Sequence, residues 1–240
     1  MHALNPVRRV GDQITEAIQL HDKVTDKQAA TRVGELLEQV GLPARRASSY
    51  PHELSGGQRQ RVVIAGALAL EPSVLVADEP VSSLDASVRG EILALLLSLV
   101  RDLGLSILVV THDLGLAWNI ADRLAVMYLG RIVEQGPTET VLANPRHPYT
   151  RALLSVVPEA HHLETQILTG EPPDPTRVPG GCRFHPRCPA LASGAAAAAG
   201  VDDRCRDQAV PILRGVAEHH AACFLTDESV KKESGDRVGR

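Results

Sequence analysis

The stretch Leu54-Ser55-Gly56-Gly57-Gln58 leads into a predicted helix over 60–70, and a short β-branched run follows at 73–77. A second run of this kind lies at 106–110. Short apolar runs bounded by polar residues are typical of buried parallel strands. The residues between the two runs keep one apolar face at helical spacing: Val88, Ile92, Leu95, Leu96, Leu99 and Leu103. Strand, crossover helix and strand in this order predict an α/β fold with a doubly wound parallel sheet flanked by helices.

Helical and strand patterns continue on both sides of this unit. Apolar residues recur three and four positions apart from Gln13 to Gly41, and Pro43 prevents continuation. A further helix is expected over 116–121. Alternating residues over 123–128 and 131–135 predict a β-hairpin.

The composition is that of an ordinary globular protein. Hydrophobic residues make up 44% of the 240 residues, charged residues 22%, and the formal net charge is -4. This balance gives no indication of a nucleic-acid partner. The longest apolar runs are far shorter than the roughly 20 residues that a membrane-spanning helix needs. Because Met1–Arg9 has no apolar core followed by a cleavage site, we expect a cytoplasmic setting.

The turn at Ser55-Gly56-Gly57 combines features that bind phosphate. Serine is a favoured N-cap residue, and the glycines allow close approach to the backbone. Unpaired amides and the positive end of a helix dipole attract an anion at such a turn. An ordinary capped helix has the same residues, so the turn alone favours that simpler interpretation.

Asp78 and Glu79 follow the first predicted strand. One carboxylate there can hold a magnesium ion and the next can orient a water molecule. Adjacent acids are common, and a histidine after a strand, such as His112, is more often structural. The order of the elements favours the catalytic interpretation over the structural one. That order is the Ser-Gly-Gly turn, a helix, an apolar strand, Asp78-Glu79-Pro80, Ser82-Ser83-Leu84-Asp85, and a second strand ending at His112.

In this order the residues closely resemble the nucleotide-binding domain of ABC transporters. Leu54 to Gln58 matches the signature motif, and Val74 to Asp78 matches the Walker B strand. The resemblance implies that Glu79 is the general base, that His112 of the H-switch contacts the γ-phosphate, and that Asp78 holds magnesium. It also implies ATP-binding residues in the signature motif and in the D-loop: Ser55, Gly56, Gly57, Gln58 and Asp85. In this family two subunits enclose two ATP molecules, and each signature motif completes its partner's site.

The phosphate-binding loop of this family is missing from the sequence. No Gly-x-x-x-x-Gly-Lys-[Ser/Thr] string occurs in it, and the Met1–Pro6 segment resembles the stretch just after the glutamine loop. We therefore expect a partial P-loop NTPase-like domain that lacks its N-terminal strands. A truncated gene or a misplaced start codon explains this most simply, and a specialised half-domain is the alternative.

The C-terminal part resembles a narrower group. His147-Pro148-Tyr149-Thr150 is similar to the extension of oligopeptide, dipeptide and nickel importer ATPases. Proline, glycine, histidine and cysteine become frequent after residue 145. We predict a partial ABC ATPase domain over 1–144, a small oligopeptide-transporter-type domain over 145–228, and a disordered tail over 229–240. Ala195–Ala199, flanked by glycines, is expected to be a flexible insertion.

The four cysteines lie in this small domain. Gly181-Cys182-Arg183-Phe184-His185-Pro186-Arg187-Cys188-Pro189 fits an element of the same family, and Cys205 and Cys223 complete the set. Four thiols suit an iron–sulfur cluster or a zinc ion. The resemblance favours a four-iron four-sulfur cluster over zinc, with buried or free thiols as the simpler alternative. The longer gap before Cys205 weakens the metal interpretation.

The resemblance implies an ATP-hydrolysing subunit, with ATP and Mg²⁺ as ligands, that energises peptide import by an ABC transporter. Its partners would be a second ABC subunit in a homo- or heterodimer, membrane-spanning permease subunits and, indirectly, an extracytoplasmic binding protein. It would work peripherally at the cytoplasmic face of the membrane. Without the phosphate-binding loop, we expect the isolated chain to be inactive.

Two alternatives remain at this stage. A non-catalytic partner would supply only its signature motif to a complete subunit. A non-transport ABC ATPase of the DNA-repair type is disfavoured because the chain has no long heptad insertion and carries His147–Thr150. Whether the substrate is a peptide, nickel or glutathione stays open.

Overall fold

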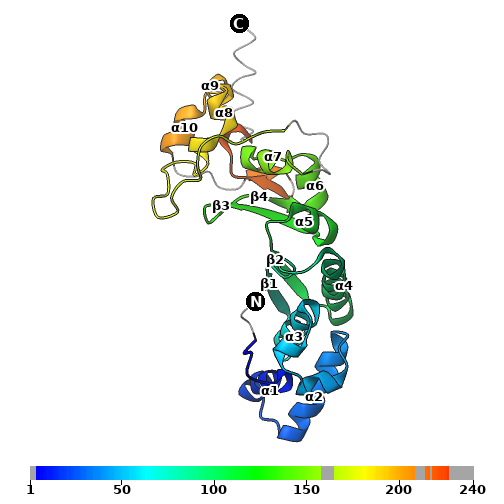
Figure 1. The fold of residues 1–240 in the computed structure, drawn as a ribbon. Coiled ribbons are helices and arrows are strands. Elements are labelled where there is room, and N and C mark those ends of the chain that lie inside the picture. The colour runs from blue at the N-terminus through cyan, green and yellow to red at the C-terminus, as the bar shows by residue number, and fades with distance from the viewer. Residues whose placement is uncertain (1–3, 158–164, 209–213, 217, 227–240) are drawn as a thin grey trace. The chain divides into compact units, whose positions relative to one another are not determined.

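The computed structural model describes residues 4–157, 165–208, 214–216 and 218–226 (Figure 1). The chain forms two compact units, Met1–His112 and Asp113–Arg240. The predicted boundary near residue 145 follows a change in composition. Strand β4 (Arg131–Pro137) precedes this boundary, yet it pairs with β6 (His219–Ala221), which follows it. The hairpin therefore packs with the C-terminal unit, and the family-domain boundary near 145 stays a prediction. The predicted tail lies outside the described residues.

Three helices form the first part of the Met1–His112 unit: α1 (Val10–His21), α2 (Asp26–Gln39) and α3 (Gly56–Leu68). The continuous helical pattern predicted up to residue 41 is two helices, because Asp22 is extended and Thr25 starts α2 with a capping box. Their buried faces supply much of the core: Val10, Ile14, Ile18, Ala29, Val33, Leu37, Val62 and Ala65. Two 3-10 helices connect α2 to α3: η1 (Ala44–Ser48) and η2 (Pro51–Glu53).

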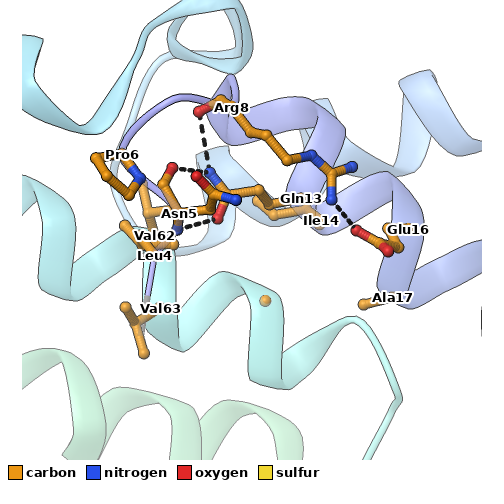
Figure 2. A pocket seen from close by; sticks show the side chains of 11 residues that line it. Leu4, Asn5, Pro6, Arg8, Gln13, Ile14, Glu16, Ala17, Val62 and Val63 are labelled. Atoms are coloured by element: carbon orange, nitrogen blue, oxygen red, sulfur yellow. Dashed lines mark hydrogen bonds and ion pairs between the residues drawn. The ribbon is translucent and has the colours of Figure 1, made fainter. Parts of the chain in front are cut away.

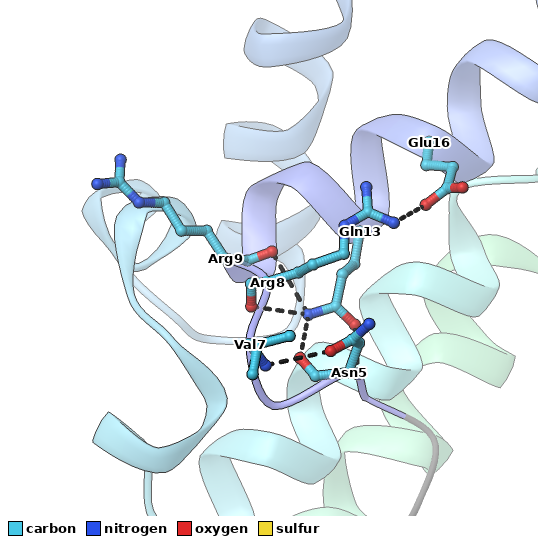
Figure 3. Close-up of polar contacts among 6 residues, drawn as sticks. All are labelled: Asn5, Val7, Arg8, Arg9, Gln13 and Glu16. Atoms are coloured by element: carbon cyan, nitrogen blue, oxygen red, sulfur yellow. Dashed lines mark hydrogen bonds and ion pairs between the residues drawn. The ribbon is translucent and has the colours of Figure 1, made fainter.

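The segment before α1 is held by Gln13. Its side-chain nitrogen donates to the carbonyl oxygens of Asn5 and Arg8 at 3.1 and 3.0 Å, and its oxygen accepts from the Asn5 amide at 2.8 Å (Figure 3). Arg8 also forms an ion pair with Glu16. These contacts place the segment beside an open groove of about 780 Å³, lined by apolar residues of α1 and α3 that include Ile14 and Val62 (Figure 2).

The strand–helix–strand unit predicted from the sequence is confirmed. α4 (Ala86–Leu103) connects β1 (Val74–Asp78) to β2 (Ser106–Val110). The strands are parallel, with Val74 opposite Ser106 and Asp78 opposite Val110. Gly104 ends α4 in the left-handed conformation at φ 67°, which glycine adopts without a Cβ penalty.

One face of this two-stranded sheet is bare. Leu75 is buried, whereas Val76 is 63% exposed and Leu108 is 57% exposed. The prediction that both strands are fully buried is therefore wrong for the face that also carries Val74 and Val110. Parallel strands are usually covered on both faces, and no described element covers this one.

The Asp113–Arg240 unit is built on an antiparallel sheet in the order β3-β4-β6-β5. β3 (Arg123–Tyr128) and β4 form the predicted hairpin, which turns at Leu129 and Gly130, both at positive φ. β6 and β5 (Arg214–Val216) add a second antiparallel pair that sequence patterns did not predict. α5 (Leu114–Ile120) agrees with the predicted helix to within two residues, and α6 (Thr138–Ala143) packs on the hairpin. The remaining elements are α7 (Pro148–Leu154), η3 (His185–Arg187), α8 (Pro189–Ala192), α9 (Ala195–Ala198), α10 (Asp202–Asp207) and η4 (Phe224–Thr226).

The prediction that Ala195–Ala199 is a flexible insertion is wrong. Residues Ala195–Ala198 form α9, and Ala196 is buried with Val201, Cys205 and Phe224. Alanine has the highest helix propensity, and its small side chain lets the short helix approach Phe224 closely. The alanine run is thus part of the core around Cys205 rather than a displacement of it.

Candidate functional site

The signature turn, Ser55–Gln58, begins α3 and is open to solvent at Ser55. Ser55 Oγ accepts from the Gln58 amide at 3.3 Å, and Gln58 Oε1 accepts from the Ser55 amide at 3.2 Å. This capping box leaves the Gly56 and Gly57 amides at the helix N-terminus, where the dipole favours an anion. The geometry is thus that of an anion-binding turn, and equally that of a well-capped helix.

Glu79 follows β1 in an uncommon backbone conformation. Its φ is 49°, and its amide donates to the Val110 carbonyl at the end of β2 at 2.9 Å. A left-handed conformation is costly for a residue with a Cβ. The hydrogen bond to β2 therefore helps to hold Glu79 where the two strands end. Asp78, the last residue of β1, is exposed beside it.

Glu79 and His112 are in direct contact. Glu79 Oε1 lies 2.6 Å from His112 Nδ1 and accepts the His112 amide at 3.2 Å. The Glu79 side chain is 34% exposed and that of His112 81% exposed. Carboxyl ends of adjacent parallel strands meet at one edge of the sheet, which is the usual place for ligands in open α/β folds. A carboxylate and an imidazole there can accept or hold a proton of a water molecule.

Asp85 precedes α4 and is also exposed. Its side chain makes no capping hydrogen bond, although the Val88 and Arg89 amides donate to its carbonyl oxygen. The structure therefore brings Glu79 and His112 together beside Asp78. It places the signature turn and Asp85 at the N-termini of the packed helices α3 and α4.

The four cysteines line one small cavity in the Asp113–Arg240 unit. The cavity has a volume of only about 10 Å³, and its wall includes Cys182, Cys188, Cys205 and Cys223. Burial raises the pKa of Cys223 to about 12 and that of Cys205 to about 11, and the charges of Cys182 and Cys188 raise both pKa values further. Burial also raises the pKa of the other two thiols.

The described side chains around this cavity are not arranged as a complete set of metal ligands. Among the described residues, no group of three or more histidine, cysteine, aspartate or glutamate side chains is placed to hold a metal ion. Gly181, before the first cysteine, is at φ 62°, and a Cβ there would lie 2.4 Å from the Arg206 carbonyl oxygen. Cys182 in turn donates its amide to the Cys205 carbonyl at 2.9 Å. The backbone thus binds the Cys182 segment to α10.

A buried cluster around Glu134 was missed by the sequence analysis. Glu134, fully buried in β4, accepts the Arg146 and His147 amides at 2.7 and 2.8 Å. His219 Nε2 lies 2.7 Å from the same carboxylate. Burial lowers the pKa of His147 to about 4. The only signal in the sequence was a single acid within the predicted hairpin, between Val133 and Gln135.

Family models match two parts of the chain. The model described as ABC transporter matches residues 2–82, and the model described as oligopeptide/dipeptide transporter, C-terminal region, matches residues 133–193. A Brucella abortus (strain 2308) protein named for peptide import and ATP binding is 46% identical over 224 residues, 93% of this chain. The chain is thus similar to ABC transporter ATP-binding proteins over most of its length. The signature turn and the end of β1 both lie within the region that the first model matches.

Two further proteins extend the comparison. The dipeptide transport ATP-binding protein DppF of Haemophilus influenzae is 47% identical over 189 residues, 78% of this chain and 58% of its own length. An ATP-binding cassette solved as a dimer in a post-hydrolysis state, bound to ADP and Pi, has a TM-score of 0.50 and 30% identity; the match covers 56% of this chain and 59% of the other. The chain spans 64% of the length of the Brucella relative. No described helix is both long and apolar enough to span a bilayer.

Proposed function

We propose that the chain is part of the ATP-binding subunit that energises peptide import by an ABC transporter. The observation that supports it most directly is the Glu79–His112 contact at the carboxyl ends of β1 and β2. In this proposal Glu79 activates the attacking water, His112 contacts the γ-phosphate, and Asp78 holds Mg²⁺. Ser55, Gly56, Gly57, Gln58 and Asp85 bind ATP across the interface with a second ABC subunit.

The pair of ATP-binding subunits works at the cytoplasmic face of the membrane, bound to membrane-spanning permease subunits. ATP-driven closure of the pair moves the permease, and hydrolysis resets it. An extracytoplasmic binding protein delivers the substrate. The names of the Brucella and Haemophilus relatives support peptides or dipeptides as that substrate.

The isolated chain is inactive in this proposal. Its sequence has no glycine-rich phosphate loop with a lysine, so the β- and γ-phosphates would lose most of their ligands. The test is magnesium-dependent ATP turnover of the purified chain beside its Glu79→Gln variant. Turnover that Glu79→Gln abolishes would overturn the proposed inactivity and support Glu79 as the base.

A second candidate is a non-catalytic partner that supplies only the signature turn. The exposed Ser55 at the N-terminus of α3 favours it. The chain would be mixed with a complete relative, such as the Haemophilus dipeptide protein, at saturating ATP. Stimulated hydrolysis that Ser55→Arg abolishes would support this role, and equal rates with both chains would exclude it.

We also propose that the four cysteines hold a metal centre, an iron–sulfur cluster in preference to zinc. Their shared cavity supports this, because a cation would offset the desolvation of four neighbouring thiolates. Closing the ligand set requires a local rearrangement from the described arrangement. The test is anaerobic reconstitution with iron and sulfide, read by visible absorption and metal analysis. Visible absorption that Cys205→Ser removes would support the cluster, whereas zinc alone or no metal would refute it.

A further inference from the structure

The signature helix α3 contacts α4 at an unusually tight point. Gly57 is buried, and a Cβ at this position would lie 2.5 Å from Val88 Cγ1. Val88 is β-branched, so inside a helix it has essentially one side-chain rotamer and cannot turn its methyl group away. The methyl group of Val88 thus occupies the space that any side chain at residue 57 would need.

A second contact lies one turn further along both helices. Arg61 Nη2 is 3.3 Å from Glu91 Oε2, and Arg61 Nη1 donates to the Val40 carbonyl at the end of α2 at 2.7 Å. The two contacts hold α3 and α4 at two successive levels. An axial slide of α3 against α4 would therefore have to break both.

Val88 also belongs to the turn that holds the Asp85 loop. Its amide and that of Arg89 donate to the Asp85 carbonyl at 3.0 and 2.9 Å, and Arg89 Nε donates to the Leu84 carbonyl at 2.9 Å. The first turn of α4 is thus bonded to the backbone of the Asp85 loop while its Val88 side chain packs on Gly57.

We propose that Val88 is a positioning residue, whose methyl group packs against Gly57 and holds the signature turn at a fixed distance from the Asp85 loop. Two segments that meet the nucleotide then move as one body when the subunits close. The effect on ATP hydrolysis rests on the proposed function, whereas the packing itself does not. Residue 57 is then glycine for two reasons. The Val88 methyl group fills the space that a side chain would need, and a phosphate approaches the Gly57 amide.

The packing is tested by exchanging the sizes of the two side chains. Gly57→Ala should lower the Tm of the chain by about 4 °C, because overpacked sites cannot relax freely. The double variant Gly57→Ala/Val88→Ala should recover at least half of that loss, since residues in contact are not additive. Leu97→Ala, an exposed position on α4, is the matched control. A double variant that simply adds the two single losses would overturn the inference.

The positioning is tested by amide hydrogen exchange of the peptide that covers the signature turn. Val88→Ala should speed exchange at the turn about tenfold, whereas Val88→Thr, which keeps the branched shape, should stay within about twofold of the original chain. An unchanged turn in Val88→Ala would refute a positioning role.

The functional consequence is tested with the Haemophilus dipeptide protein as the complete subunit. Val88→Ala should lower the maximal stimulated rate about fivefold while the concentration of chain needed for half-maximal stimulation stays unchanged, because only the geometry of a bound partner is altered. Val88→Thr should retain the rate. A raised half-maximal concentration with an unchanged maximal rate would indicate mere loss of folded chain and overturn the inference. If the original chain gives no stimulation, the second candidate function fails, and the exchange experiment still decides the inference.

Discussion

The two compact units each contain a glutamate in contact with a histidine, and the two pairs differ chiefly in burial. Glu79 and His112 meet at 2.6 Å with side chains 34% and 81% exposed. Glu134 and His219 meet at 2.7 Å with side chains 0% and 4% exposed. The first pair keeps its remaining hydrogen-bonding capacity for water or a ligand. In the second pair, the Glu134 carboxylate also accepts hydrogen bonds from the amides of Arg146 and His147.

The difference in burial indicates that the exposed Glu79–His112 pair is available for a reaction, whereas the buried Glu134–His219 pair stabilises the fold. An exposed ion pair contributes little to stability because water screens it, whereas a buried carboxylate must be fully hydrogen-bonded to be tolerated. Equal distances between the partner atoms therefore do not imply equal roles.

The largest expected effect comes from removing the buried carboxylate. Glu134→Ala leaves two backbone amides and the His219 ring without an acceptor, and we expect a loss of about 3–5 kcal/mol in the free energy of unfolding. Urea denaturation followed by fluorescence of Trp118, the one tryptophan, reports on this unit. Glu218→Ala, which removes an exposed ion pair with Arg123, should cost less than about 1 kcal/mol. Similar losses in both variants would remove the distinction between buried and exposed pairs.

A smaller effect concerns pH. Because burial lowers the pKa of His147 to about 4, the unfolded chain binds a proton at this residue at a higher pH than the folded chain does. Stability should therefore fall as the pH drops from the unfolded pKa of roughly 6.5 towards 4, by about 3 kcal/mol for this residue. His147→Asn keeps an N-cap side chain for α7 and should flatten the profile in this window.

The same urea titrations at several pH values measure this profile. His52→Asn, at an exposed position, is the matched control and should leave the original slope unchanged. A His147→Asn chain that still loses as much stability as the original would show that other groups govern acid sensitivity.

The smallest expected effect belongs to the exposed pair. Glu79→Gln and His112→Ala should each change the free energy of unfolding by less than about 1 kcal/mol, because a screened pair is removed. Thermal unfolding of both variants beside the original chain measures this. A loss approaching that of Glu134→Ala would show that the pair is a structural element rather than one available for a ligand.

The elements that local patterns define were predictable from the sequence. Short apolar runs identified β1 and β2, helical periodicity identified α4, and alternation identified the hairpin. The break at Asp22 was missed because no glycine or proline marks it. The alanine run was misjudged because flanking glycines suggested flexibility, whereas burial of Ala196 depends on Phe224, which is distant in sequence.

The candidate site was predictable in part for a similar reason. Glu79 and His112 each follow a predicted parallel strand, and the ends of neighbouring parallel strands meet. The Glu134 cluster was not predictable, because its carboxylate and His219 lie 85 residues apart and belong to strands whose pairing no local pattern indicates. The packing of Val88 on Gly57 likewise depends on how two helices approach each other, which their separate patterns do not specify.

The bare apolar face of β1 and β2 has a practical consequence for anyone purifying this polypeptide. Val76 and Leu108 form an exposed apolar surface. Among the described residues, β1 and β2 pair only with each other, so each has an unpaired edge. Unpaired strand edges recruit strands from other molecules. The protein should therefore aggregate at high concentration. Dilute samples or a solubilising fusion partner will be needed to keep it monomeric.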